Sequence, residues 1–184
     1  MPPSPEPNSR SDQALVELCN RGDAAAFEAL YRRYRDWVVR LASRFTGDSD
    51  DALDCLQETF TYVLKKFPGF TLTASMTTFL YPVVKNISIR IRQKRRRFMP
   101  GAEALEQLPA PPVAPDTGTS DLAAVISRLP EAQREVVLMR FVDGMALEEI
   151  ARALVIPLGT VKSRLHHAIQ SLKVDPRTQR YFEE

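Results

Sequence analysis

The chain has few residues that could build a disulfide framework or a metal site. Its 184 residues include two cysteines, Cys19 and Cys55, and two histidines, His166 and His167. The cysteines have no metal-ligand spacing, and two adjacent histidines cannot share one face of a helix. We therefore expect no metal and no disulfide, which suits a reducing compartment.

Long apolar runs and catalytic motifs are also missing. No run approaches the length of a membrane span, and prolines fill the start of the chain, where a signal peptide would need an apolar core. The seven glycines build no phosphate-binding loop, and no nucleophile stands with a matching base. The sequence thus predicts a cytoplasmic protein that is not an enzyme and uses no cofactor.

Proline divides what remains into two modules. Four of the fourteen prolines lie in residues 1–7 and five lie between residues 98 and 121. Such segments favour extended, unpacked chain. The net charge is only +2, so any nucleic-acid binding must arise from local segregation of charge rather than from the field of the whole protein.

Helical periodicity dominates between these segments. Apolar residues recur at helical spacing over residues 15–19, 27–45, 53–67 and 79–91, and again from 122 to 172. Asp23 and Ser49 are expected helix N-caps. The sequence predicts an all-α protein with two small helical domains joined by a flexible linker. The predicted boundaries are a disordered tail at 1–11, a first domain at 12–97, the linker at 98–121, a second domain at 122–175 and a C-terminal tail at 176–184.

An acidic segment opens the third predicted helix. Five acids and no base lie between residues 48 and 58, with Gln57 among them. Acids at a helix N-terminus are stabilised by the helix dipole, so one interpretation is a well-capped, solvated helix. The other is a docking surface for a basic protein partner, to which Gln57 adds hydrogen-bonding specificity.

A basic segment follows at the end of the fourth predicted helix. Six cations lie within residues 90–97, preceded by Lys85 and Asn86. Cations near a helix C-terminus are favoured by the dipole, but six exceed what capping needs, and contact with phosphates explains the excess. Asn86 can offer a donor and an acceptor to a base edge. Nearby aromatic residues can stack exposed bases, although at helical spacing they more often form core: Phe70, Phe79 and Tyr81.

Residues 129–173 indicate a helix-turn-helix. Acids outnumber bases from Glu131 to Glu149, whereas residues 157–173 contain cations and histidines and no acid. Two apolar faces, at 150–154 and 161–172, are separated by a break at 155–159. The second helix is therefore the one expected to contact duplex DNA.

Taken together, these segments resemble the extracytoplasmic-function (ECF) group of sigma-70 family RNA polymerase sigma factors. The resemblance covers residues 12–97 and 122–173. It rests on DALDCLQETF at 51–60, FLY at 79–81 with Asn86, LPE at 129–131, and EEIA at 148–151 with GTVKSRL at 159–165.

This resemblance implies a promoter-specificity subunit with a sigma region 2-like helical bundle and a sigma region 4-like helix-turn-helix. Its partners would be core RNA polymerase and promoter DNA, as duplex and as melted non-template strand, and an anti-sigma factor such as those that hold many relatives inactive. The polymerase-binding residues would be Asp51, Asp54, Gln57 and Glu58.

The resemblance also divides the DNA contacts between the two modules. A base flipped from the non-template strand would lie near the loop at 69–76 and Asn86. The downstream promoter element would contact Tyr81, Lys85, Asn86, Arg90, Arg92, Lys94, Arg95, Arg96 and Arg97. The upstream element would be recognised as duplex, in the major groove, by Thr160, Lys162, Ser163, Arg164, His166 and His167.

Several residues depart from the family pattern. Pro82 stands where Arg is usual, and because a proline inside a helix costs about 3 kcal/mol, the helix should kink or start late. Phe79 replaces a usual Trp, and His167 a usual Arg. Ala146 replaces a hydroxyl cap, and Val155 stands where Gly is common, so a left-handed backbone there would be strained.

Two alternatives remain open from the sequence. A stand-alone helix-turn-helix regulator would bind duplex DNA without polymerase, as a dimer on a palindromic site. A protein-interaction decoy would bind an anti-sigma factor and never contact DNA.

Overall fold

The computed structural model describes residues 10–98 and 119–181, which form two compact units, one on each side of the gap. Every regular element in these two ranges is a helix, which confirms the predicted all-α fold. No helix in the described ranges is both long and apolar enough to cross a membrane. Residues 1–9 of the predicted tail at 1–11 and residues 99–118 of the predicted linker at 98–121 lie outside the described residues.

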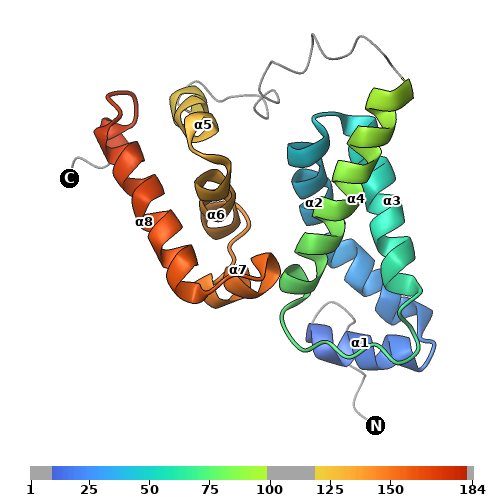
Figure 1. The fold of residues 1–184 in the computed structure, drawn as a ribbon. Coiled ribbons are helices and arrows are strands. Elements are labelled where there is room, and N and C mark those ends of the chain that lie inside the picture. The colour runs from blue at the N-terminus through green and yellow to red at the C-terminus, as the bar shows by residue number, and fades with distance from the viewer. Residues whose placement is uncertain (1–9, 99–118, 182–184) are drawn as a thin grey trace. The chain divides into compact units, whose positions relative to one another are not determined.

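The first unit is a bundle of helices α1 (Asp12–Asn20), α2 (Ala24–Thr46), α3 (Ser49–Leu64) and α4 (Met76–Phe98) (Figure 1). Each helix turns an apolar face inward, as the periodicity predicted. Burying a Leu or Phe side chain contributes about 1.5–3 kcal/mol, so the shared core holds the bundle together. Its buried residues include Leu15, Leu30, Val38, Leu41, Cys55, Phe60, Leu80 and Val84.

Short polar side chains begin these helices. Asp23 Oδ1 accepts from the N–H groups of Ala25 and Ala26 at 2.9 and 3.1 Å, as expected of an N-cap. At α3 the predicted cap Ser49 is wrong by one position. Asp48 caps the helix instead, and its carboxylate accepts from the N–H of Asp50 at 2.9 Å, so Ser49 is already helical.

Helix α4 begins six residues before Pro82, so the expectation of a late start is wrong. The start is set by Ser75, whose hydroxyl accepts from the N–H of Thr78 at 3.2 Å and whose carbonyl accepts from the N–H of Phe79 at 3.2 Å. A proline in the second turn removes one backbone donor, and Met76, Leu80 and Val84 on either side of it are still buried in the core.

The second unit contains α5 (Thr119–Arg128), α6 (Glu131–Phe141), α7 (Leu147–Leu154), α8 (Leu158–Val174) and a short 3-10 helix, η3 (Gln179–Tyr181). Helix α5 begins three residues before the predicted boundary at Leu122. After α8 the chain folds back, and the buried Thr178 hydroxyl donates to the Leu172 carbonyl. The core of α5, α6 and α8 includes Val125, Leu129, Val137, Ala168 and Leu172.

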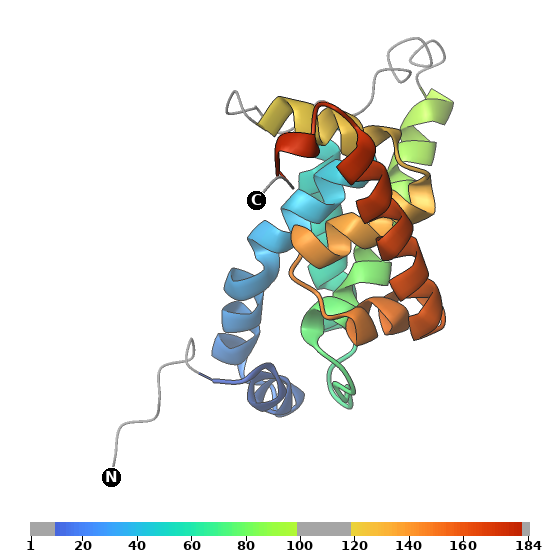
Figure 2. The same ribbon diagram turned by 90° about the vertical axis from the view of Figure 1, so that its left-hand side faces the viewer.

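Helices α7 and α8 meet at one end of this unit and form the helix-turn-helix (Figures 1 and 2). The turn depends on Val155, whose backbone is left-handed at φ 55° and ψ 47°. The Val155 N–H donates to the Arg152 carbonyl at 3.3 Å and the Ile156 N–H donates to the Ala151 carbonyl at 3.0 Å. This is a Schellman ending, which normally carries Gly at the left-handed position.

Candidate nucleic-acid interface

The predicted polymerase-binding residues lie together on one side of α3. Asp54, Gln57 and Glu58 are exposed and Asp51 is half-buried. Positions 51, 54 and 58 have the three- and four-residue spacing of one helical face, and Gln57 borders it. We call these four residues the acidic surface.

The predicted basic residues lie on α4 from Lys85 onward. Arg90, Lys94, Arg95, Arg96 and Arg97 are exposed. Two cations are partly covered by the end of α2: an Nη1 proton of Arg92 is donated to the Phe45 carbonyl at 3.2 Å, and Lys85 Nζ lies 5.8 Å from the centre of the Phe45 ring. These two cations therefore have less freedom to move toward a phosphate than the exposed arginines.

Ion pairs join the acidic surface to the basic segment, a contact that the sequence analysis missed. Arg90 pairs with Glu58, and Arg95 Nη1 lies 2.6 Å from Asp48 Oδ2 and 3.1 Å from Asp51 Oδ2. The N–H of Asp51 and then the Arg95 guanidinium lower the pKa of the Asp48 carboxyl. The two charged surfaces therefore adjoin along α3 and α4 and partly neutralise each other.

Asn86 and Tyr81 have different surroundings, although they are close in sequence. Asn86 is exposed on α4, so its amide is available to a partner. Tyr81 is only 2% exposed, and its ring meets the Phe45 ring edge-on at 6.3 Å. The expected base contact by Tyr81 therefore has no support, because Tyr81 belongs to the buried face of α4 together with Leu80 and Val84.

An exposed aromatic residue lies nearby on α3 and was not singled out from the sequence. Tyr62 is 39% exposed, and its ring is stacked on that of Phe79 with centroids 6.5 Å apart. Phe79 in turn lies 4.7 Å from the Phe70 ring, and Lys66 Nζ lies 4.8 Å from the centre of the Tyr62 ring. Tyr62 thus combines an accessible ring with an adjacent cation, the pairing that stacks single-stranded bases.

The predicted upstream-element residues all belong to α8, where none is buried. The opposite side of α8 packs into the core through Val161, Ala168 and Leu172. The two histidine rings are edge to face, with centroids 5.7 Å apart. The side away from the core carries Thr160, Lys162, Ser163, Arg164, His166 and His167, which is the face a recognition helix presents to the major groove.

The described residues include no group of three or more His, Cys, Asp or Glu side chains placed to hold a metal ion. The side chains on these surfaces offer hydrogen bonding and charge pairing. An acidic helix suits a basic protein, and basic helices suit phosphates and base edges.

Family models match both units of the chain. The model described as Sigma-70 region 2 matches residues 30–98, and the model described as Sigma-70, region 4 matches residues 120–172. The first match contains the acidic surface and the basic segment, and the second contains α7 and all but the last two residues of α8. The class defined by this fold and these surfaces is thus the sigma factor, a subunit of RNA polymerase.

Curated relatives extend over nearly the whole chain. The RNA polymerase sigma-H factor of Pseudomonas aeruginosa is 30% identical over 88% of this chain and 91% of its own length. The ECF RNA polymerase sigma factor SigW of Bacillus subtilis is 29% identical over 86% of this chain and 92% of its own length. The chain belongs to the sigma-70 family, in its ECF group, and it functions in transcription initiation.

Solved structures show the same fold at low sequence identity. The structure of CnrH in complex with the cytosolic domain of CnrY has a TM-score of 0.65 and 22% identity, and covers 87% of this chain and 93% of that one. The structure of the sigma factor RpoE in complex with the anti-sigma factor NepR from Bartonella quintana has a TM-score of 0.59 and 21% identity. It covers 80% of this chain and 94% of that one. The matches to both sigma regions favour a sigma factor over a stand-alone regulator or a decoy.

Proposed function

We propose that the first unit binds core RNA polymerase through the acidic surface of α3, defined by Asp51, Asp54, Gln57 and Glu58. The observation that carries this proposal is the gathering of these side chains on one exposed helical face. Leu53 is 54% exposed one turn before Gln57 and adds apolar area at the edge of the acidic surface. An apolar contact bordered by charge and amide groups is a combination typical of protein interfaces.

The same unit would hold the downstream promoter element along α4. Exposed arginines would contact the phosphates, and Asn86 would contact a base of the melted non-template strand. The ion pairs of Arg90 and Arg95 do not prevent this, because exposed pairs of this kind contribute about 0–1 kcal/mol. A phosphate can therefore replace the carboxylate as their partner. The basic residues of α4 proposed to contact the downstream element are Lys85, Arg90, Arg92, Lys94, Arg95, Arg96 and Arg97.

The second unit would recognise the upstream element as duplex DNA through α8. Its N-terminal half would enter the major groove, with the residues of its outer side, from Thr160 to His167, facing base edges and phosphates. Residues 12–97 and 122–175 would thus act as two DNA-binding domains, and residues 98–121 would set the spacing between them. The protein would have no catalytic activity of its own and would work in the cytoplasm, where RNA polymerase is found.

Two charge-changing experiments test the assignments separately. Asp54→Lys should weaken binding to core polymerase by about tenfold or more, whereas Glu17→Lys, which reverses an exposed acid on α1, should leave it unchanged. Fluorescence anisotropy with labelled protein measures both affinities. Equal effects of the two substitutions would show that binding follows net charge and not the acidic surface.

The DNA assignment is tested with a double variant, Lys162→Glu with Arg164→Glu. A good side-chain contact to a base edge contributes about 1–3 kcal/mol, so the loss of two side chains should lower promoter binding by the holoenzyme by about a hundredfold or more. The control, Gln170→Glu with Ser171→Glu, adds two carboxylates to exposed positions later in α8. Normal transcription by the Lys162 and Arg164 variant would contradict the proposal and support a decoy.

We also propose that an anti-sigma protein binds this chain. The support is the pair of structurally similar proteins that were solved with a bound partner, the CnrY cytosolic domain or the anti-sigma factor NepR. Such a partner would compete with core polymerase if it covered the acidic surface. Affinity capture with the wild-type protein and with Asp54→Lys, followed by mass spectrometry, tests this: a partner held equally by both does not use Asp54.

A further inference from the structure

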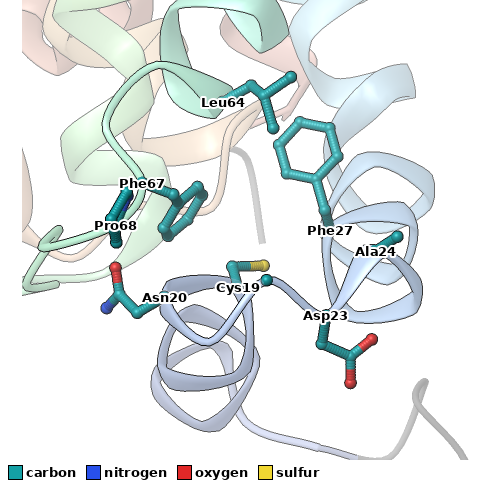
Figure 3. A pocket seen from close by; sticks show the side chains of 9 residues that line it. Cys19, Asn20, Asp23, Ala24, Phe27, Leu64, Phe67 and Pro68 are labelled. Carbon is teal, nitrogen blue, oxygen red and sulfur yellow. The ribbon is translucent and has the colours of Figure 1, made fainter.

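One side chain of α1 holds the segment that joins α3 to α4. The side-chain oxygen of Asn20 accepts from the backbone N–H groups of Gly69 and Phe70 at 2.8 and 3.0 Å, and its Nδ2 donates to the Phe70 carbonyl at 2.8 Å. Figure 3 shows the Asn20 side chain beside Phe67 and Pro68, at the start of this segment. These hydrogen bonds link residues about fifty positions apart in the sequence.

The geometry requires an amide at position 20. The amide pairs with both backbone groups of Phe70, as a neighbouring strand would. A carboxylate could accept from the two N–H groups but could not donate to the Phe70 carbonyl, and its charge would face that oxygen. Gly69 contributes a backbone at φ 101°, which L side chains rarely adopt. Asn20 and Gly69 therefore fix the direction in which the chain leaves α3.

Further along the α3–α4 segment, some side chains pack against the bundle and two others are exposed. The Phe70 ring contacts both Phe67 and Phe79, with centroids 5.8 and 4.7 Å apart. Leu72 is buried, whereas Thr71 and Thr73 on either side of it are exposed. The segment therefore exposes two threonine side chains shortly after Phe70, which belongs to an aromatic cluster with Phe79 and Tyr62.

We infer that Asn20 is a positioning residue for promoter opening. It holds the α3–α4 segment so that Thr71, Thr73 and the aromatic cluster face the melted non-template strand. This inference rests on the proposed function of the first unit and adds a residue of α1 to it. Asn20 contacts no DNA itself, because its amide is occupied by the backbone of Gly69 and Phe70.

The hydrogen bonds of Asn20 to Gly69 and Phe70, which we call the clamp, are tested first in the free protein. Amide hydrogen exchange measured by NMR should speed up by about tenfold or more at Gly69 and Phe70 in Asn20→Ala. In Gln13→Ala, which truncates an exposed side chain on the same helix, these rates should not change. Asn20→Asp keeps the acceptor oxygen, so protection at Gly69 should persist. Unchanged exchange at both amides in Asn20→Ala would overturn the clamp.

The functional consequence is tested in the holoenzyme. The DNA is a promoter identified by mapping the transcripts that core polymerase and this protein make from fragmented chromosomal DNA. Permanganate reactivity of unpaired thymines should show that Asn20→Ala slows opening of the duplex promoter by about tenfold, while its affinity for core polymerase stays normal. On the same promoter with a pre-opened mismatched bubble the defect should shrink, because melting is then already complete.

A purely structural role makes a different prediction. Val38→Ala removes part of a fully buried side chain on α2, and it serves as a control for lost stability once the unfolding temperatures of the two variants are compared. If Val38→Ala slows promoter opening as much as Asn20→Ala at equal stability, the inference is wrong. If the wild-type protein binds core polymerase but opens no promoter, the proposed function of the first unit is wrong. The exchange experiment would still decide whether the clamp exists in the free protein.

Discussion

Replacing Val155 with glycine should stabilise the second unit, although it removes a side chain. Val155 is left-handed at φ 55° and ψ 47° and is 89% exposed. The left-handed region costs an L-residue about 1–2 kcal/mol, and a β-branched residue is an outlier there. Glycine removes this strain but gives the unfolded chain more freedom, a cost of about 0.4–1 kcal/mol. Because the exposed valine makes little packing contact, the net gain should be about 1 kcal/mol.

Hydrogen exchange of buried α8 amides, such as that of Ala168, measures this gain in the full-length protein. One kcal/mol should slow exchange through global unfolding by about fivefold. The matched control is Val142→Gly, which makes the same change at an exposed valine that ends α6 with an ordinary right-handed backbone. That control should be destabilising, since it relieves no strain. Faster exchange in Val155→Gly, or equal effects of the two changes, would refute the reasoning.

Three further outcomes follow from single side chains. Ala146→Ser should stabilise α7 by about 1 kcal/mol, measured by urea unfolding. Glu149 Oε2 already accepts from the Ala146 N–H at 2.8 Å, so only the hydroxyl half of the capping box is missing. No gain in stability would contradict this prediction. Burial, with a contribution from Asp23, raises the pKa of the Cys19 thiol from 9.0 to about 11. As the pH rises the thiol therefore ionises first in the unfolded chain, and the first unit should lose stability between about pH 9 and pH 11. The Cys19→Ala variant should lose less stability over this range. The Asp51 N–H and Arg95 lower the pKa of the Asp48 carboxyl. The contribution of this carboxylate to folding stability should therefore disappear as the pH falls below the usual pKa of an aspartate. Urea titrations at pH 6 and pH 3 should show a smaller loss of stability for Asp48→Asn than for the wild type.

The fold could be predicted from local patterns, because each helix has an apolar face and a polar start. Asp23 lies where the sequence predicted a cap, and the strain expected at Val155 exists because its turn needs a left-handed residue. The cap of α3 was missed by one position, since Asp48 and Ser49 are both good caps and only the geometry decides between them. Pro82 was expected to kink or delay α4, and the delay is absent because the cap at Ser75 and buried apolar side chains outweigh the cost of one proline.

Contacts between distant segments were not predictable in the same way. The pair of Arg95 with Asp51 joins residues far apart in sequence, and it exists because α3 and α4 pack side by side. Tyr81 was counted among the DNA contacts because cations lie near it in sequence, although its helical spacing already favoured the core, where the structure places it. No sequence signal marked Asn20, because an asparagine at the end of a helix usually has only a local role.

Transcription by core RNA polymerase on fragmented chromosomal DNA, with and without this protein, shows directly whether the protein directs polymerase to promoters through α8. RNA starts are mapped by sequencing. We expect new starts preceded by a shared two-part motif, and we expect them to disappear with the Lys162→Glu, Arg164→Glu variant. The absence of new starts with folded wild-type protein would contradict this expectation, as would new starts that survive in that variant.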